Sequence, residues 1–283
     1  MTLAPTGVLV AEAAARGAAV PAVNVVTLEH AEAIVRGATR AGTGVILQVS
    51  ENAVLFHGGD PRPLLLACRA LAAAASGPVG VHLDHVQDAA LIERAFEIAG
   101  EVGLGSIMID AARLDYAANV RETADAARRA HALGLWVEAE LGEVGGKDGA
   151  HAPGVRTDPG QAAAFVAATG VDALAVAVGS SHAMTEPSAS LDTRLIERLA
   201  AVVPVPLVLH GSSGVPDAGL ASAVRAGIRK VNVGTALNVA GTAALRAALA
   251  AEPALVDPRG PLRASRAAME EVVEHLCRTL ASA

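Results

Sequence analysis

Aromatic residues are scarce in this sequence, where Phe, Trp and Tyr together make up 2% of 283 residues. A core with so few large rings has to pack small aliphatic side chains in tight layers, and Ala, Val, Leu and Gly dominate the composition. Such packing is typical of a parallel barrel or a doubly wound sheet. The length allows one large α/β domain or two smaller ones.

Cysteine is also scarce and there is no excess of positive charge, and each of these features excludes a class of protein. The two cysteines, Cys68 and Cys277, are too few for a disulfide framework and fit a reducing cytoplasm. The formal net charge is -7 and no run of Lys or Arg occurs, so nucleic acids and acidic membranes would be repelled. We therefore expect no nucleic-acid partner and no membrane partner.

Long hydrophobic runs do not occur either. No stretch approaches the roughly 18 consecutive apolar residues of a membrane-spanning helix. Glu12 and Arg16 interrupt the segment in which a signal peptide needs an unbroken apolar core. We expect a cytoplasmic protein.

Eight short apolar runs alternate with longer amphipathic segments along the chain. Strands are predicted at 19–27, 44–50, 78–86, 105–111, 135–142, 173–181, 206–213 and 230–235. Segments with apolar residues spaced by three and four lie between them, as at 88–99, 115–133 and 191–202. Eight such repeats predict an α/β fold, a single (β/α)8 TIM barrel domain over 1–283. An open doubly wound sheet is the alternative.

Two segments lie outside the repeating pattern. The segment 262–280 is predicted to form an extra C-terminal helix that could serve oligomer contacts. The connection 143–160 has five glycines and no apolar periodicity. Loops of this length in a compact domain often act as mobile lids, so we expect a lid over the barrel mouth.

The stretch GVHLDHVQDA, residues 80–89, shows an apolar strand that ends in polar side chains. A buried carboxylate or imidazole without a partner is costly, so something must compensate these groups. In (β/α)8 barrels the catalytic groups lie where strands end, on the carboxyl-terminal face. This rule places on one rim Ser50, Asp84, His85, Asp110, Glu140, His182, His210, Asn232 and Thr235.

Three histidines from three strand ends, His85, His182 and His210, match the needs of a catalytic zinc site with an open position for substrate. The other six histidines are assigned no role, and His82 is expected to face away from His85 because side chains alternate along a strand. Asp110 and Glu140 each close an apolar strand. A divalent cation would relieve the repulsion between clustered carboxylates. Asp110 and Glu140 would then either bind a second metal ion or hydrogen-bond to the ligands of the first. The alternative is that they form salt bridges or cap helices.

Asp84 directly precedes His85, and neighbouring residues of a regular strand point to opposite faces. Both can reach one ligand only where the chain leaves the sheet, so the site must lie at the very end of this strand. A carboxylate beside a substrate oxygen is well placed to transfer a proton, which is the role predicted for Asp84. The turns HGSSG at 210–214 and NVGT at 232–235 follow the seventh and eighth strands, where such barrels commonly bind phosphate.

These motifs resemble, in order and spacing, the class II, zinc-dependent fructose-bisphosphate and tagatose-bisphosphate aldolases. The resemblance runs from about residue 7 to 280 and is carried by HLDHV, MID, VEAELGEVGG, GVDALAVAVGSSH, PLVLHGSSG, KVNVGT and DPR. It implies a (β/α)8 barrel, a homodimer or homotetramer, and a sugar-phosphate substrate. The implied reaction is the reversible cleavage of a ketose 1,6-bisphosphate into dihydroxyacetone phosphate and an aldehyde.

The resemblance also implies roles for individual residues. His85, His182 and His210 match the ligands of the catalytic Zn2+, Asp84 matches the acid/base, and Asp110 with Glu140 matches a second divalent ion position. A requirement for a monovalent cation stays open. Other matching positions hold substrate: Ser50 at the aldehyde end, Arg259 reaching a neighbouring subunit's distal phosphate, and a dihydroxyacetone phosphate cradle made of Gly211, Ser212, Ser213, Asn232, Val233, Gly234 and Thr235.

Three departures from the family pattern bear on the substrate. Ala183 stands where the family usually has Gly, and no Lys follows it, which implies a weaker phosphate contact in that loop. In the lid segment GGKDG, Asp148 would have to exchange the proton at the dihydroxyacetone phosphate carbon. The motif NVGT replaces the NIDT of fructose enzymes and favours tagatose or another ketose phosphate.

Other enzyme classes remain as alternatives. A Schiff-base aldolase needs a buried lysine, but the two lysines are Lys147 in the lid and Lys230, which we expect at the wrong end of the barrel. A metallohydrolase on the same barrel would carry a His-x-His pair on its first strand, which AVPAVNVVT lacks. A zinc aldolase for another ketose, or an inactive family member acting as a regulatory subunit, also fits the sequence.

Overall fold

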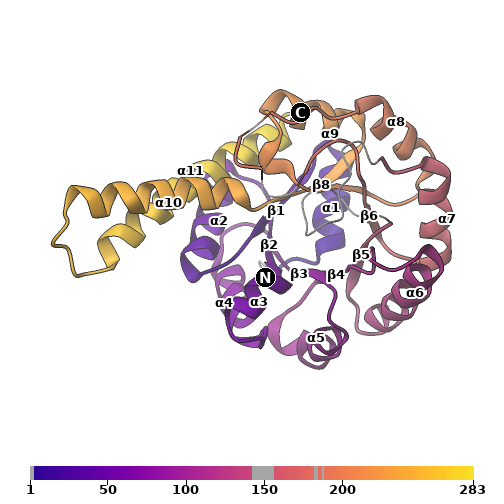
Figure 1. Cartoon of the computed structure of the whole chain (residues 1–283), viewed down its shortest axis with the longest axis horizontal. Coiled ribbons are helices and arrows are strands. Elements are labelled where there is room, and N and C mark those ends of the chain that lie inside the picture. Colours follow the sequence, from indigo (N-terminus) through magenta and orange to yellow (C-terminus); the bar gives the residue numbers. More distant parts are fainter. Residues whose placement is uncertain (1–2, 142–155, 182–183, 187) are drawn as a thin grey trace.

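The computed structural model describes residues 3–141, 156–181, 184–186 and 188–283. Eight strands form one closed barrel in sequence order, each parallel to its neighbours, and β1 closes the ring by pairing with β8 (Figure 1). The strands are β1 (Val20–Asn24), β2 (Val45–Ser50), β3 (Val79–Val86), β4 (Ser106–Ile109), β5 (Trp136–Glu140), β6 (Ala173–Ala175), β7 (Leu207–Leu209) and β8 (Ile228–Val233). The predicted (β/α)8 TIM barrel is confirmed, and the open sheet is excluded.

Most of the described helices surround the barrel (Figure 1). They are α1 (Thr6–Ala15), α2 (Leu28–Ala41), α3 (Glu51–Phe56), α4 (Arg62–Ala74), α5 (Ala89–Val102), α6 (Tyr116–Ala132), α7 (Pro159–Thr169), α8 (Thr193–Val202), α9 (Asp217–Ala226), α10 (Thr235–Ala251) and α11 (Arg259–Ala281), with a 3-10 turn at Ser212–Gly214. Several begin at an aspartate whose side chain accepts a backbone N–H, as Asp88 and Asp158 do. Helices α2, α5 and α7 end at glycines in the left-handed conformation, which suits a residue without a Cβ. Local sequence therefore fixes where these helices begin and end.

Among the described residues, the buried apolar side chains form three clusters, of which the largest lies between the strands and the helices. Aliphatic side chains such as Leu47, Leu83 and Leu174 fill the space between strands and helices without exposure to solvent. At the amino-terminal ends of the strands, Leu9 and Val10 of α1 pack in one cluster with early strand residues, so α1 closes this end of the barrel. The open end is therefore the carboxyl-terminal one, where the polar strand ends meet.

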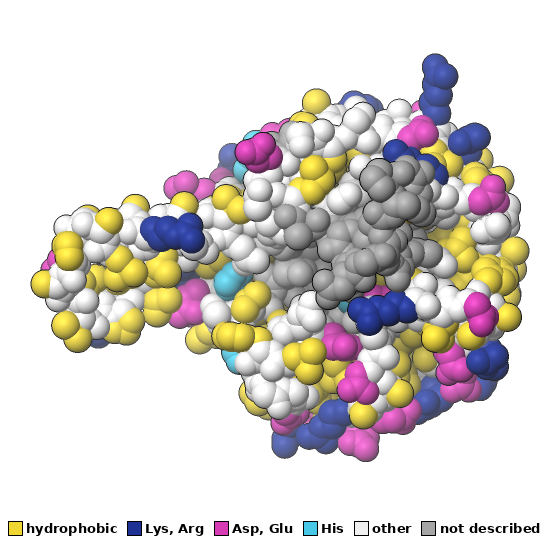
Figure 2. Space-filling view, viewed as in Figure 1, with side chains coloured by type: hydrophobic (Ala, Val, Ile, Leu, Met, Phe, Trp, Pro, Cys, Tyr) yellow, Lys and Arg dark blue, Asp and Glu magenta, His cyan; other side chains and the backbone are white. Residues whose placement is uncertain are grey.

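Helices α10 and α11 form an arm that projects beyond the barrel (Figure 1). The returning α11 packs on α2, where Gly37 allows close approach to Val273 and Arg40 forms ion pairs with Glu270 and Glu274 at 2.9 and 2.7 Å. This helix includes the extra helix predicted at 262–280. Figure 2 shows hydrophobic side chains on the arm. Its exposed apolar residues include Val239, Leu249, Val256 and Leu262.

Among the described helices, none is both long enough and apolar enough to cross a membrane.

Candidate active site and metal centre

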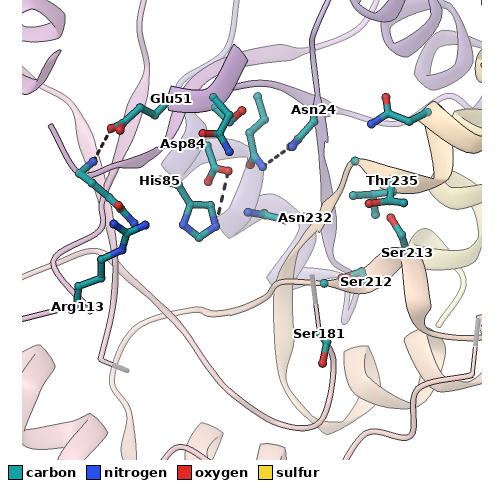
Figure 3. A pocket seen from close by; sticks show the side chains of 18 residues that line it. Asn24, Glu51, Asp84, His85, Arg113, Ser181, Ser212, Ser213, Asn232 and Thr235 are labelled. Carbon is teal, nitrogen blue, oxygen red and sulfur yellow. Dashed lines mark hydrogen bonds and ion pairs between the residues drawn. The ribbon is translucent and has the colours of Figure 1, made fainter. Parts of the chain in front are cut away.

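A cavity of about 430 Å³ opens at the carboxyl-terminal end of the barrel (Figure 3). Its walls come from the ends of β1, β2, β3 and β8 and from the connections that follow β4, β6 and β7. These elements are far apart in sequence, and only the closure of the barrel brings their ends to one mouth. Much of the predicted rim therefore shares a single pocket.

Asp84 and His85 reach this pocket from consecutive positions because the end of β3 is irregular. His85 has a φ of 52°, and the pairing of β3 with β4 shifts register between Leu83 and Val86. A left-handed backbone is rare for residues other than glycine and turns the next side chain away from the regular alternation. Both side chains consequently line the same cavity (Figure 3). The two side chains thus share one cavity at the end of the strand, and their joint role there stays a prediction.

Three buried side chains form a candidate metal centre at the bottom of the pocket. Ligand atoms of Asp84, His85 and His210 all lie within 4.8 Å of one another, and the two imidazole rings have centroids 4.8 Å apart. Two imidazoles and a carboxylate suit Zn2+. The Oδ2 atom of Asp84 faces Nε2 of His85 at 3.9 Å, while its buried Oδ1 atom, 3.6 Å from Nε2 of His82, makes no hydrogen bond within the described residues. The donor set therefore fits a divalent ion.

His85 is held in place by Asp110, at the end of β4. The Nδ1 atom of His85 lies 2.9 Å from Oδ2 of Asp110, and the side-chain amide of Gln87 donates to the same oxygen at 2.8 Å. The other ring nitrogen, Nε2, lies 3.9 Å from Oδ2 of Asp84. A carboxylate on one imidazole nitrogen fixes the ring orientation and leaves the other nitrogen to bind a metal.

His210 has the same kind of support from below. Its Nε2 atom lies 2.8 Å from Oε1 of Glu138, and Lys230 donates to the other oxygen of Glu138 at 2.7 Å. Burial raises the pKa of Glu138, but the Lys230 ammonium and His210 lower it by more, so that the pKa falls to about 2. Burial lowers the pKa of His210, which keeps a neutral imidazole at neutral pH. Its Nδ1 atom lies 3.6 Å from Oε2 of Glu140 at the rim.

Asp84 is backed by a polar chain through the barrel interior. Its Oδ1 atom lies 3.6 Å from Nε2 of His82, whose Nδ1 is 2.8 Å from Oγ of Ser106, which in turn lies 2.6 Å from Oγ1 of Thr6 on α1. Burial raises the pKa of Asp84, but three facing imidazoles outweigh this effect and hold that pKa well below its usual range. The carboxylate is therefore ionised at neutral pH and can accept a proton.

The glycine turns after β7 and β8 form the opposite wall of the pocket. Gly211 has a φ of 66°, and a Cβ atom there would lie 2.4 Å from the carbonyl oxygen of Ser181. The hydroxyl of Ser213 accepts the backbone N–H of Ala236 at 3.1 Å, in the first turn of the 17-residue helix α10. Small side chains and a helix N-terminus make this wall suitable for a phosphate group.

Nearly the whole chain matches one protein family, because residues 5–283 fit the family described as fructose-bisphosphate aldolase class-II. The chain belongs to this family. Class II aldolases are generally metal-dependent, which agrees with the donor cluster at the mouth. The protein is therefore an aldolase, a lyase-type enzyme, and the family implies a sugar-phosphate substrate.

Solved structures agree with this assignment. The YdjI aldolase from Escherichia coli K12 is 30% identical over 98% of this chain and 97% of its own, with a TM-score of 0.84. A Coccidioides immitis protein proposed to be a fructose-1,6-biphosphate aldolase is 28% identical over 98% of this chain and 96% of its own, with a TM-score of 0.86.

The structure of this class II aldolase brings most of the predicted site residues together. Those that line the pocket are Ser50, Asp84, His85, Gly211, Ser212, Ser213, Asn232, Val233, Gly234 and Thr235. His210, Asp110 and Glu140 lie around them through the contacts described above. Ser50 also caps α3, because its hydroxyl accepts the N–H of Ala53 at 3.2 Å.

The remaining predicted residues are not among those described around the pocket. His182, Ala183 and Asp148 are outside the described residues, as is most of the predicted lid, whose final residues 159–160 begin α7. Arg259 begins α11 on the arm, where its side chain is 81% exposed and paired with Asp257 at 2.6 Å. It does not line the pocket of its own chain.

The prediction for Lys230 is wrong. Lys230 is not at the far end of the barrel: its fully buried Nζ atom lies 2.8 Å from Oδ1 of Asn232, directly beneath the pocket. The sequence spacing of Lys230 could have revealed this position, because residues two apart on a strand point to the same face of the sheet. Lys230 precedes Asn232 by two, as Glu138 precedes Glu140 and His82 precedes Asp84.

Sequence reasoning also missed pocket residues on connecting segments. Ser181, Asn24, Gln87 and Arg113 line the cavity, although none of them was assigned a role from the sequence. Ser181, Asn24 and Gln87 stand within stretches that were singled out in the sequence, whereas Arg113 does not. Asn24 ends β1, where its side-chain oxygen accepts from the amide of Gln48 at 2.7 Å. The rule of strand ends could have found Asn24 but not Arg113, which lies three residues beyond Asp110.

Proposed function

We propose that this aldolase catalyses the reversible cleavage of a ketose 1,6-bisphosphate, of the fructose or tagatose type, into dihydroxyacetone phosphate and an aldehyde. The observation that supports this best is the placement of Asp84 and the buried cluster with His85 and His210 beside the glycine turns that follow β7 and β8. One wall can hold a phosphate while the cluster faces the bond to be broken. A zinc aldolase for another ketose, phosphorylated or not, is the alternative.

His85, His182 and His210 are proposed to hold a catalytic Zn2+, with Asp110 and Glu140 at a second divalent position. A zinc ion acts as a Lewis acid that stabilises the negative charge developing on the donor half during cleavage. The protein prepares its own groups for this task. Glu138 and Asp110 orient two of the imidazoles, and burial keeps the pKa of His210 low enough for a neutral ligand.

Asp84 is the proposed base in the cleavage direction. It accepts the proton of the substrate's C4 hydroxyl group as the C3–C4 bond breaks, so that this oxygen becomes the aldehyde carbonyl. The electron pair of the broken bond remains with the donor half, which takes up a proton at C3 to give dihydroxyacetone phosphate. We assign that second proton transfer to Asp148. In the condensation direction the same groups work in reverse.

The donor phosphate is proposed to bind at Gly211–Ser213 and Asn232–Thr235. The N-terminus of α10 and the hydroxyls of Ser213 and Thr235 offer hydrogen-bond donors to an anion there, whereas the hydroxyl of Ser212 donates to the carbonyl oxygen of Leu209 at 3.2 Å. Ser50 is proposed to contact the aldehyde half. The weak point of the phosphate contacts is Ala183, for which the family has a glycine.

We also propose that the enzyme forms homodimers or homotetramers through the arm. Exposed apolar side chains on the arm, such as Val256 with 92% exposure, would be covered in such an assembly. Arg259 at the start of α11 would then reach the pocket of a neighbouring subunit and hold the distal phosphate. The two cysteines are free and buried, which suits a reducing cytoplasm.

The test is cleavage by the zinc-loaded enzyme, measured as loss of the ketose so that phosphorylated and unphosphorylated substrates are followed alike. Fructose and tagatose 1,6-bisphosphates are compared with their 1-phosphate and unphosphorylated forms. A chelator should abolish cleavage and zinc should restore it, and His210→Ala should lose zinc and cleavage together. Cleavage of none of these ketoses would overturn the proposal.

Borohydride distinguishes a Schiff-base route. Lys230 is unsuited to that chemistry because its ammonium group is paired with Glu138 at 2.7 Å. Borohydride with substrate should therefore leave the enzyme active. Inactivation with covalent labelling of a lysine would exclude the metal-dependent mechanism.

A further inference from the structure

Arg113 occupies a fixed position at the rim of the pocket, between β4 and α6. Asp110, just before it, accepts the backbone N–H of Ala112 at 3.4 Å, and Asp115, just after it, accepts the N–H of Ala118 at 2.9 Å to cap α6. Both ends of this short connection are thus held by hydrogen bonds. The backbone that carries the guanidinium group is positioned by the barrel.

Arg113 is also the only Lys or Arg among the described residues that line the cavity. The structure gives its guanidinium no hydrogen bond or ion pair with another described residue, although carboxylates lie on the same side of the mouth. Those carboxylates have other partners. Glu51 accepts the backbone N–H groups of Gln87 and Asp88 at 2.7 and 3.1 Å. Asp110 accepts a hydrogen bond from the side chain of Gln87 and contacts His85. The charge of Arg113 is therefore left for a ligand.

The position of Arg113 matches one end of an extended substrate. Figure 3 shows Arg113 on the side of the cavity away from Ser212, Ser213 and Thr235, with Asp84 and His85 between. A donor phosphate bound at the glycine turns places the bond to be broken near Asp84. The aldehyde half then extends toward Arg113.

We propose that Arg113 binds a terminal anionic group, a phosphate or a carboxylate, on the aldehyde half and so gives the enzyme its preference for charged aldehydes. The planar guanidinium fork fits either oxyanion with paired hydrogen bonds. This inference rests on the proposed aldolase function and adds a specificity residue from the subunit's own chain. It differs from the role of Arg259, which depends on a neighbouring subunit.

The test is condensation of dihydroxyacetone phosphate with three aldehydes of equal carbon number. They are glyceraldehyde, glyceraldehyde 3-phosphate and 2-hydroxy-3-oxopropanoate. The carbon farthest from the aldehyde carries a hydroxyl group in the first and a phosphate in the second, and it is a carboxylate in the third. The zinc-loaded wild type should favour at least one charged aldehyde over glyceraldehyde by at least about tenfold in kcat/KM. The charged aldehyde that is favoured identifies the group that Arg113 holds.

Arg113→Ala should remove this preference, by about 10- to 100-fold and mainly through KM, and Arg113→Lys should keep part of it. Arg121→Ala on α6 is the matched control, because its side chain is 69% exposed and paired with Glu122. It should leave the preference intact. Arg113→Gln provides a second neutral variant, and circular dichroism with thermal unfolding checks that each variant folds.

Two results would overturn the inference while leaving the aldolase function in place. One is a wild type that condenses charged and uncharged aldehydes equally well. The other is a preference that survives both neutral Arg113 variants but is lost in Arg259→Ala. A wild type that condenses none of the three aldehydes would instead overturn the proposed function and this inference together.

Discussion

The Nε2 atom of His210 lies 2.8 Å from Oε1 of Glu138, inside the barrel and without exposure to solvent. Because Glu138 is ionised, it accepts a hydrogen bond and holds the proton of His210 on Nε2. The lone pair of Nδ1 then lies on the side of the ring that faces Glu140, whose Oε2 atom is 3.6 Å away. Lys230 balances the negative charge from the other side at 2.7 Å. A buried ion pair under the site thus determines how the imidazole of His210, a proposed zinc ligand, is presented.

Glu138→Gln should lower zinc affinity by about 10- to 100-fold, because a neutral amide no longer fixes the tautomer of His210. Isothermal titration of the metal-free protein measures this, and the absorption spectrum of the cobalt-substituted form reports the geometry of the site. Glu271→Gln, on the exposed face of α11, is the control. Unchanged affinity in Glu138→Gln would show that Glu138 serves stability only.

Asp84→Asn should bind zinc nearly as well as the wild type but lose about 10²- to 10⁴-fold in kcat, because an amide cannot accept the C4 hydroxyl proton. Zinc content and cleavage rate are measured on the same preparation. Asp84 lies close enough to His85 and His210 to bind a metal itself. A loss of zinc parallel to the loss of rate would make Asp84 a ligand and remove its assignment as the base.

Gly211→Ala should destabilise the enzyme by clearly more than Gly17→Ala, by at least about 1 kcal/mol. The two glycines have similar φ angles of 66° and 70°, so the cost of a left-handed alanine is shared. They differ in space: a Cβ at Gly211 meets a carbonyl oxygen at 2.4 Å, whereas a Cβ at Gly17 meets nothing within 4 Å. Urea unfolding measures both. An equal loss of unfolding free energy in the two variants would mean that the turn after β7 shifts to accommodate the added Cβ atom at little cost.

The stability of the metal-free protein should fall as the pH drops below about 6.5. Burial lowers the pKa of His82 and of His210 in the folded state, so unfolding takes up protons in this window and becomes easier as the pH falls. Glu138, whose folded pKa is about 2, adds a further loss as the pH falls below about 4.5. The free energy of unfolding between pH 8 and pH 4 measures this.

His82→Gln should make this dependence shallower, because one buried imidazole no longer takes up a proton on unfolding. A wild-type stability that stays flat between pH 7 and pH 5 would contradict the assignment of neutral, buried histidines. The comparison is made on metal-free protein throughout, since a bound metal adds its own pH dependence.

The fold was largely predictable because its signals are local. Each of the eight predicted strands is present, and helix ends follow aspartate and glycine residues that act through their own backbone. Strand ends were less predictable: the predicted strand 173–181 shortens to β6 at Ala173–Ala175. Apolar residues indicate that a segment is buried, not that it pairs with a neighbouring strand. Residues 176–178 are buried but lie beyond the last residue of β6.

By itself, the sequence determined the barrel and the rim to which Asp84, His85 and His210 belong, because strand order and burial follow from periodicity along the chain. Only the tertiary structure decided how these groups face one another. The left-handed turn at His85, the ion pair of Lys230 with Glu138 and the exposed charge of Arg113 at the mouth all depend on strands that meet only when the barrel closes. Contacts between segments about 90 residues apart leave no period in the sequence, so their geometry appears only in the folded chain.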